Sequence, residues 1–317
     1  MMMPWLLLGL GLVILLLAGD VLVRGAVNLS LRLGVPALIV SLTIVAFGTS
    51  APELLIAIQA VAEHAPSIAL GNVVGSNTAN ILLVLGIPAI LTGLHTSECD
   101  TRKNYVFMLA ATVLFIALAF CGVFTVWSGV VLLAALALVL GAAFLEARAH
   151  RRCGCDSGDD LEEIDEADPN MPYWRISVYL LLGLIGLPLG ADILVDNGTE
   201  IARTYDVSER VIGLTLIAIG TSLPELATTV MAALRRQADV ALGNVIGSNM
   251  FNLLAIVGVA TFIGPIPVKS TFLTFDLWVM LGASLLLVPF VFLKQDITRN
   301  WGFVLTGLYL AYMVVVL

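Results

Sequence analysis

Runs of about twenty apolar residues, separated by short polar stretches, occupy almost the whole chain. A helix of about 20 residues spans the hydrocarbon core of a bilayer, whereas the strands of a membrane barrel need only about ten. The pattern therefore predicts an all-α membrane protein with ten transmembrane helices that contact the lipid bilayer. The expected spans are 1–24, 37–62, 68–93, 104–123, 125–147, 174–196, 209–233, 240–264, 272–293 and 301–317. Because no basic region precedes the first run and no small-residue cleavage site follows it, we expect a retained span and not a signal peptide.

One polar segment, 149–173, interrupts a chain of 317 residues that is 60% hydrophobic and only 12% charged. Eight of the 23 acidic residues lie between Asp156 and Asp168, which leaves 15 acidic and 15 basic residues in the rest of the chain. No basic patch is present to bind phosphates, so nucleic acid is excluded as a partner. We expect residues 1–148 and 174–317 to form two membrane halves, joined by a solvated linker that lacks the ligand spacing of an EF-hand.

Cys153 and Cys155 lie near His150, at the start of this linker. The further ligands that a zinc site needs at fixed spacing are missing, so we expect reduced thiols and no disulfide framework.

Lysine and arginine residues are distributed unevenly between alternate sides of the predicted spans. With the N-terminus outside, twelve fall on the cytoplasmic side and three, Arg203, Arg210 and Lys269, on the outer side. Positive charge accumulates on the cytoplasmic side of membrane proteins. We therefore expect both termini outside and the acidic linker in the cytoplasm, most simply in a prokaryotic inner membrane.

Two polar motifs occur twice in the chain with the same offset of 172 residues. Gly-Thr-Ser-Ala-Pro-Glu at 48–53 returns at 220–225 with one change, and Ala-Leu-Gly-Asn-Val-Val-Gly-Ser-Asn at 69–77 returns at 241–249 with one change. Five predicted spans separate each motif from its copy, so the two halves should cross the membrane in opposite directions. Inverted repeats of this kind are typical of secondary transporters, whose binding site lies near the bilayer midplane.

Each motif places a proline one residue before a glutamate. Pro52 and Pro224 have no amide hydrogen, so we expect a kink and a free backbone carbonyl oxygen beside Glu53 and Glu225. A charged side chain at a helix centre costs about 3 kcal/mol on insertion scales, and helix packing does not explain two such residues at matching positions. Asp20 and Asp192 lie nearer the ends of their predicted spans, where we expect them at the membrane interface.

The neighbouring polar residues share helix faces with these glutamates or form a stripe on the next span. Residues three or four positions apart lie on one face of a helix. The spacing predicts a site made almost entirely of oxygen atoms, which favours Ca²⁺ or Na⁺ over zinc, copper or iron. Two carboxylates balance one Ca²⁺, or can take up protons or Na⁺ in its place. The residues are Thr49, Ser50, Glu53, Asn72, Ser76 and Asn80, repeated as Thr221, Ser222, Glu225, Asn244, Ser248 and Asn252.

The glycines of the second motif are four residues apart, Gly71 with Gly75 and Gly243 with Gly247. Small residues at this spacing let membrane helices approach closely, so we expect these glycines at helix contacts.

The doubled motifs resemble the α-repeats of the cation/Ca²⁺ exchanger superfamily, particularly its prokaryotic Na⁺/Ca²⁺ exchanger-like members. The resemblance implies ten helices in a five-plus-five arrangement, with cation sites among the second, third, seventh and eighth. It implies a Ca²⁺ site formed by the Glu53 and Glu225 carboxylates with the Thr49 and Thr221 carbonyl groups, and a sliding motion of the first and sixth helices. The implied Na⁺ ligands are Ala46, Ser50, Ser76, Ala218, Ser222 and Ser248, with Asn80 and Asn252 beside the central site. Some relatives carry Asp in the second of these positions, so the number of coupled ions is left open.

These observations predict a secondary antiporter that exchanges Ca²⁺ for Na⁺ by alternating access. The alternatives are a Ca²⁺/H⁺ antiporter, since a desolvated glutamate can carry a proton, a cation channel, and a membrane scaffold that transports nothing. We expect no enzymatic activity and no cofactor. Inorganic cations are the expected ligands, and we expect a monomer without a protein partner.

Overall fold

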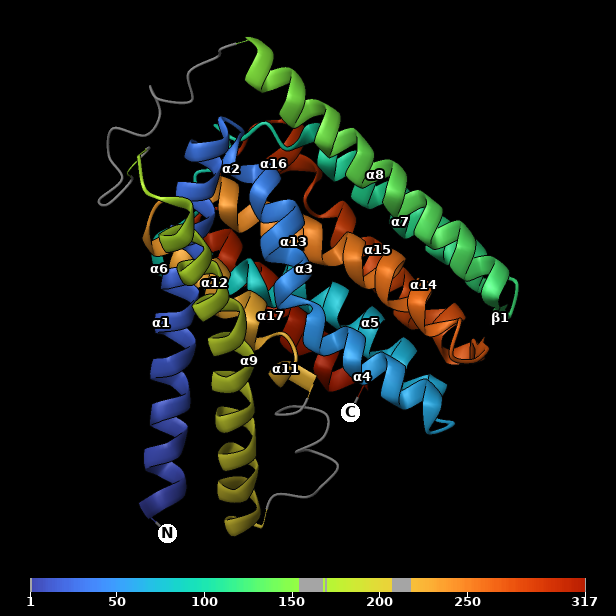
Figure 1. The fold of residues 1–317 in the computed structure, drawn as a ribbon. Coiled ribbons are helices and arrows are strands. Elements are labelled where there is room, and N and C mark those ends of the chain that lie inside the picture. Colours follow the sequence, from blue (N-terminus) through green and yellow to red (C-terminus); the bar gives the residue numbers. More distant parts are fainter. Residues whose placement is uncertain (1, 154–167, 169, 207–217, 317) are drawn as a thin grey trace.

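The computed structural model describes residues 2–153, 168, 170–206 and 218–316, and these are mostly helical (Figure 1). In this part of the chain eight helices are long and apolar enough to cross a membrane, or nine if the bent pair 37–49 and 51–62 counts as one span. The predicted class of α-helical membrane protein is confirmed. The predicted span 209–233 is described only from Ala218 onward, and its apolar helix there, Leu223–Leu234, is too short to count as a span by itself.

The first half of the chain alternates long helices with interrupted ones. The interruptions are π-helical turns, labelled η, or breaks of one or two residues. The elements are α1 (Met2–Leu33), α2 (Ala37–Val40), η1 (Ser41–Val45), α3 (Ala46–Thr49), α4 (Ala51–Ala62), α5 (Pro66–Ala79), η2 (Asn80–Val84), α6 (Gly86–Thr92), α7 (Arg102–Ala119), β1 (Val123–Phe124) and α8 (Val126–Cys153).

The second half repeats the succession of long and interrupted helices. The elements are α9 (Tyr173–Thr204), α11 (Ala218–Gly220), α12 (Leu223–Leu234), α13 (Ala238–Met250), η4 (Phe251–Ile256), α14 (Val257–Ala260), β2 (Ile266–Pro267), η5 (Phe272–Asp276), α15 (Leu277–Leu285), α16 (Val288–Phe292) and α17 (Arg299–Val316). Strand β2 precedes the fourth span of this half, whereas β1 follows the fourth span of the first half.

Helices α1 and α9 extend further than predicted and pack side by side along one edge of the molecule (Figure 1). Helix α1 continues past the expected end at Arg24, because the next helix-breaking residues are Gly34, with φ of 64°, and Pro36. Asp20 therefore lies well inside the helix, and the prediction that it lies near the end of its span is wrong. Its carboxylate pairs there with Arg24 at 3.0 Å and with Arg235 of α12.

The two halves agree in backbone detail at matching positions. Helices α4 and α12 have equal lengths and end in the same turn, in which His64 and Arg236 have φ of 61° and 56°. In that turn Ala65 N donates to Ala60 O and Gln237 N donates to Ala232 O, both at 2.8 Å. The repeated sequence therefore forms a repeated local structure.

Helix α13 lies at the centre of the protein and is buried from Val240 to Met250. A Cβ atom at Gly243 would lie 2.8 Å from the carbonyl oxygen of Leu38, and one at Gly247 would lie 2.6 Å from the Cβ atom of Ala46. The predicted close approach is therefore confirmed for this pair. For Gly71 and Gly75 it stays a prediction, because the segment that matches residues 38–46 is 210–218, most of which lies outside the described residues.

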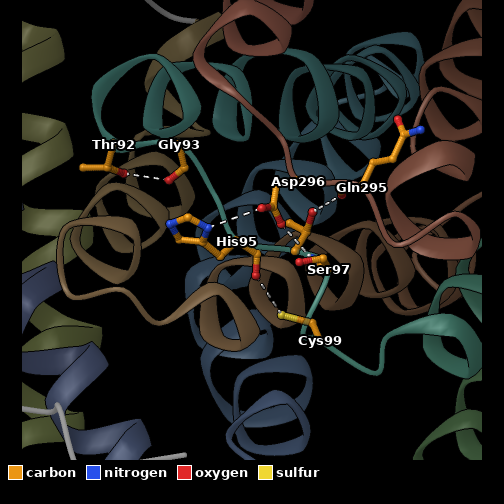
Figure 2. A network of polar contacts seen from close by, with 8 residues as sticks. Thr92, Gly93, His95, Ser97, Cys99, Gln295 and Asp296 are labelled. Carbon is orange, nitrogen blue, oxygen red and sulfur yellow. Dashed lines mark hydrogen bonds and ion pairs between the residues drawn. The ribbon is translucent and has the colours of Figure 1, made fainter.

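Loops from the two halves meet at two places. Strand β1 pairs antiparallel with β2, and Leu94 forms an isolated bridge with Ile297. Next to that bridge Asp296 accepts hydrogen bonds from Ser97 N at 3.0 Å and from His95 Nδ1 at 3.4 Å (Figure 2). Thr96 Oγ1 donates to the carbonyl oxygen of Gln295 at 2.7 Å. These contacts join the loop after α6 to the loop before α17.

Candidate cation site

The helix of each half breaks immediately before its glutamate. Ser50 has φ of −87° and ψ of 4°, and Ser222 has φ of −91° and ψ of 5°, so neither residue continues the helix. Pro52 and Pro224 follow in the first turn of α4 and α12, because a proline cannot donate the helical hydrogen bond but fits a helix start. The axes on either side of Ser50 differ by 42°. The predicted kink is therefore present.

Glu53 and Glu225 lie in the first turns of α4 and α12, and both are 0% exposed. Glu225 Oε1 accepts a hydrogen bond from Ser50 Oγ of the other half at 3.1 Å. Both carboxylate oxygens of Glu53 and Oε2 of Glu225 have no hydrogen-bond partner among the residues that the structure describes. A buried carboxylate without a partner is costly, and a bound cation would remove that cost.

Further polar side chains from the four central segments surround the glutamates. Thr49 Oγ1 lies 3.3 Å from Asn244 Oδ1 and 3.4 Å from Ser248 Oγ, both on α13. Asn80 Nδ2 donates to Asn249 Oδ1 at 3.1 Å, where η2 meets α13. Residues of both halves therefore meet around one buried polar region.

The structure buries most of the predicted site residues in these segments. Thr221 is half-buried, and Ala218 begins α11 although its side chain lies outside the described part of the chain. Ser222 Oγ, Asn80 Oδ1 and both polar atoms of Asn252 have no hydrogen-bond partner among the described residues. Such buried polar atoms are rare and indicate a place for a bound water or ion. Asn72 is half-buried, and the buried members are Ala46, Thr49, Ser50, Glu53, Ser76, Asn80, Ser222, Glu225, Asn244, Ser248 and Asn252.

The atoms of this region that could coordinate a cation are carboxylate, hydroxyl and amide oxygens. Within the described chain no cluster of three or more His, Cys, Asp or Glu side chains could hold a metal ion. Oxygen ligands without His or Cys suit Ca²⁺ and Na⁺. Cys155 lies outside the described residues, so the interpretation of the Cys153–Cys155 pair as reduced thiols stays a prediction.

Three buried polar residues of this region were not predicted from the sequence. Asn77 and Asn249 belong to the repeated Gly-Ser-Asn motif, and Asn249 Nδ2 contacts Asn77 O at 3.5 Å, so the repeat itself was a signal for them. Thr229 contacts Asn244 at 3.2 Å and lies four residues after Glu225, on the same helix face.

Comparisons with known proteins agree with this architecture over the whole chain. The model of the family "Sodium/calcium exchanger protein" matches residues 3–145 and 176–317. The putative antiporter CaxA of Alkalimonas amylolytica is 36% identical over 280 residues, which are 88% of this chain and 86% of the relative. The sodium/calcium exchanger MaX1 of Methanosarcina acetivorans is 32% identical over 341 residues, covering 98% of this chain and 97% of the relative.

Among solved structures, the sodium-calcium exchanger NCX_Mj soaked without Na⁺ and Ca²⁺ is similar with a TM-score of 0.82 and 31% identity. The match covers 98% of each chain. Family model, relatives and fold therefore agree, and the chain belongs to the sodium/calcium exchanger family of membrane transporters.

Proposed function

We propose that the protein is a secondary antiporter that exchanges Ca²⁺ for Na⁺ at a site formed by Glu53 and Glu225. The observation that carries this proposal is the pair of fully buried carboxylates, one from each half, which follow matching helix breaks and keep oxygens without a hydrogen-bond partner in the described chain. Two such charges balance one Ca²⁺. The names of CaxA, MaX1 and NCX_Mj support antiport of these ions.

The backbone carbonyl groups of Thr49 and Thr221 complete the proposed Ca²⁺ site. The Thr49 hydroxyl is engaged inside the protein, at 3.3 Å from both Ala46 O and Asn244 Oδ1, so its carbonyl oxygen is the atom we assign to Ca²⁺. Asn80 and Asn252 lie beside the site in this proposal. We assign the flanking Na⁺ sites to Ala46, Ser50, Ser76, Ala218, Ser222 and Ser248.

We further propose ten spans in two inverted halves, with both termini outside and the linker 149–173 in the cytoplasm. During alternating access, the helix that is now covered in one half would become exposed, and its counterpart in the other half would become covered. In the present arrangement α1 covers α12, where Ala227 is 6% exposed, whereas Leu55 at the matching position of α4 is 67% exposed. Two halves with similar structure and different neighbours can exchange those neighbours and open the site to the other side.

A Ca²⁺/H⁺ antiporter is the second candidate, because unpartnered buried carboxylates also suit protons. Uptake of radioactive Ca²⁺ into proteoliposomes, under separately imposed Na⁺, K⁺ and H⁺ gradients, distinguishes the two. We expect uptake with an outward Na⁺ gradient and none with a pH gradient in Na⁺-free medium. Uptake driven only by the pH gradient would favour the second candidate, and uptake without any counter-ion would favour a channel.

The variants Glu53→Gln and Glu225→Gln test the site itself. Each removes one charge that balances Ca²⁺, so we expect Na⁺-driven uptake to fall at least about 100-fold, which is about 2.7 kcal/mol. Glu63→Gln is the matched control, because Glu63 lies exposed at the other end of α4, where its carboxylate accepts a hydrogen bond from Gln59 Nε2 at 2.8 Å. Undiminished uptake in both site variants would refute the proposed site.

A further inference from the structure

A chain of buried hydrogen bonds lies behind Glu225 and ties it to the neighbouring helix. Thr229 Oγ1 donates to the backbone carbonyl oxygen of Glu225 at 2.7 Å and accepts from Asn244 Nδ2 of α13 at 3.2 Å. Asn244 Nδ2 also lies 3.4 Å from the same Glu225 oxygen, and Asn244 Oδ1 accepts from Thr49 Oγ1. All four residues are at most 1% exposed. The first turn of α12 is thus fixed to α13 and, through Thr49, to the other half.

Among the residues that the structure describes, Glu53 of the first half has no such connection, although the sequence of this half otherwise repeats that of the second. Ala57 stands where Thr229 would be expected and offers no hydroxyl group. Asn72 occupies the position that matches Asn244, and its Nδ2 atom has no hydrogen-bond partner among the residues that the structure describes. The backbone of Glu53 therefore lacks the clamp that holds Glu225.

The carboxylate of Glu225 also has more hydrogen-bond support than that of Glu53, as its backbone does. Glu225 accepts a hydrogen bond from Ser50, whereas neither oxygen of Glu53 has a hydrogen-bond partner in the described part of the chain. A coordinating side chain that is held in place before the cation arrives loses less conformational entropy on binding. The site therefore binds the cation more tightly. A coordinating side chain without such support can change its orientation at a lower cost in free energy. The two halves thus supply two carboxylates with different mobility.

We infer that Thr229 and Asn244 are positioning residues that hold Glu225 as the fixed cation ligand, while Glu53 is the carboxylate that reorients during exchange. This inference rests on the proposed function, because it assigns unequal roles within the same site. Thr229 does not touch the cation in this account and acts through the backbone of Glu225. Its effect should therefore appear in the affinity for Ca²⁺ more than in the maximal rate.

The test compares Thr229→Val with Thr228→Val and Thr229→Ser in proteoliposomes. Valine keeps the shape of threonine and removes the hydroxyl group, whereas serine keeps the hydroxyl group and removes the methyl group. Thr228 is the matched control, because it is equally buried and donates to Pro224 O within its own helix at 2.8 Å. The readouts are the Ca²⁺ concentration for half-maximal Na⁺-driven uptake and the maximal rate.

We expect Thr229→Val to raise the half-maximal Ca²⁺ concentration about three- to tenfold, the range for one lost buried hydrogen bond. The maximal rate should stay within about twofold, and Thr228→Val and Thr229→Ser should match the unaltered protein. Equal affinities in the two valine variants, or a larger loss in Thr229→Ser than in Thr229→Val, would overturn the inference while the proposed function stands. Absence of Na⁺-driven uptake in the unaltered protein would overturn both.

Discussion

At the scale of single residues, the protein buries its two central carboxylates, and most of their oxygens have no hydrogen-bond partner among the residues that the structure describes. The doubled motifs identified Glu53 and Glu225 in the sequence, because a repeated acid in an apolar span has no packing role. The contact of Ser50 with Glu225 was not predictable, since it joins residues 175 positions apart. Thr229 was missed for a related reason, because a single threonine in an apolar helix is common.

Asp296 provides a prediction for a residue outside the membrane spans. Burial tends to raise the pKa of this carboxyl, but hydrogen bonds from Ser97 and His95 outweigh burial and lower the pKa below its usual value. The pKa is thus lower in the folded than in the unfolded protein, so Asp296 stabilises the fold above the unfolded value of about 3.9, and this contribution is lost as pH falls through the folded value.

We therefore expect Asp296→Asn to lower the melting temperature in detergent at neutral pH. The difference from the unaltered protein should shrink as the pH falls below about 4. Gln295→Ala is the control, because the contact at Gln295 uses its backbone carbonyl oxygen and not its side chain (Figure 2). A difference that stays constant between neutral and acidic pH would contradict this role of the ionised carboxylate.

At the scale of helices, proline and glycine positions explain much of the observed structure. Pro52 and Pro224 correctly predicted the breaks, whereas hydrophobic runs underestimated the lengths of α1 and α9. For α1 the predicted span ended at the charged residue Arg24, whereas the helix continues to the helix-breaking residues Gly34 and Pro36, and Arg24 pairs with Asp20 inside it. The π-helical turns η2 and η4 near Asn80 and Asn252 had no signal in the periodicity, and such turns often occur at functional sites.

Gly247 tests the close packing of α13 directly. A Cβ atom there would lie 2.6 Å from Ala46 Cβ and closer still to the carbonyl oxygen of Leu42, so α13 could not keep its present position. We expect Gly247→Ala to destabilise the protein by about 1–3 kcal/mol, as an overpacked core residue does. Gly141→Ala in α8 is the control, because no atom of the described chain lies within 4 Å of that Cβ position.

Alanine favours a helix over glycine by about 1 kcal/mol, so the control should be neutral or stabilising. Melting temperatures of both variants, without added Ca²⁺, measure the difference. A Gly247→Ala variant as stable as Gly141→Ala would show that α13 does not need its glycine for this contact.

At the scale of the whole molecule, the two halves share their local structure but not their surroundings. Asp20 pairs with Arg235 where α1 packs on α12. The matching positions in the other half are Asp192 and Glu63, both acidic, so the same ion pair cannot form there. The sequence predicted the repeat and the family, but it did not predict this asymmetry, which depends on how the helices pack.

Cross-linking α1 to α12 tests whether this packing changes during transport. In a background with the four native cysteines replaced, Gly19→Cys and Met231→Cys should form a disulfide, because a Cβ atom at Gly19 would lie 3.3 Å from Met231 Cγ. We expect oxidation to stop Na⁺-driven Ca²⁺ uptake and a reducing agent to restore it, since α1 could no longer leave α12.

The matching pair in the other half is Gln59→Cys with Ala191→Cys. We expect this pair to cross-link only if the alternative arrangement is populated, and its oxidation to stop transport as well. Full uptake by the oxidised Gly19–Met231 variant would contradict alternating access by exchange of these contacts.

The orientation of the termini and the cytoplasmic position of the linker stay predictions from the distribution of basic residues.

The central claim is that Glu53 and Glu225 together hold the transported Ca²⁺. The most direct measurement is anomalous X-ray scattering from crystals of the protein grown with Ca²⁺ and without Na⁺. The account predicts one anomalous peak about 2.3–2.6 Å from carboxylate oxygens of both residues. A peak that contacts neither glutamate, or that persists unchanged in Glu53→Gln and Glu225→Gln crystals, would contradict it.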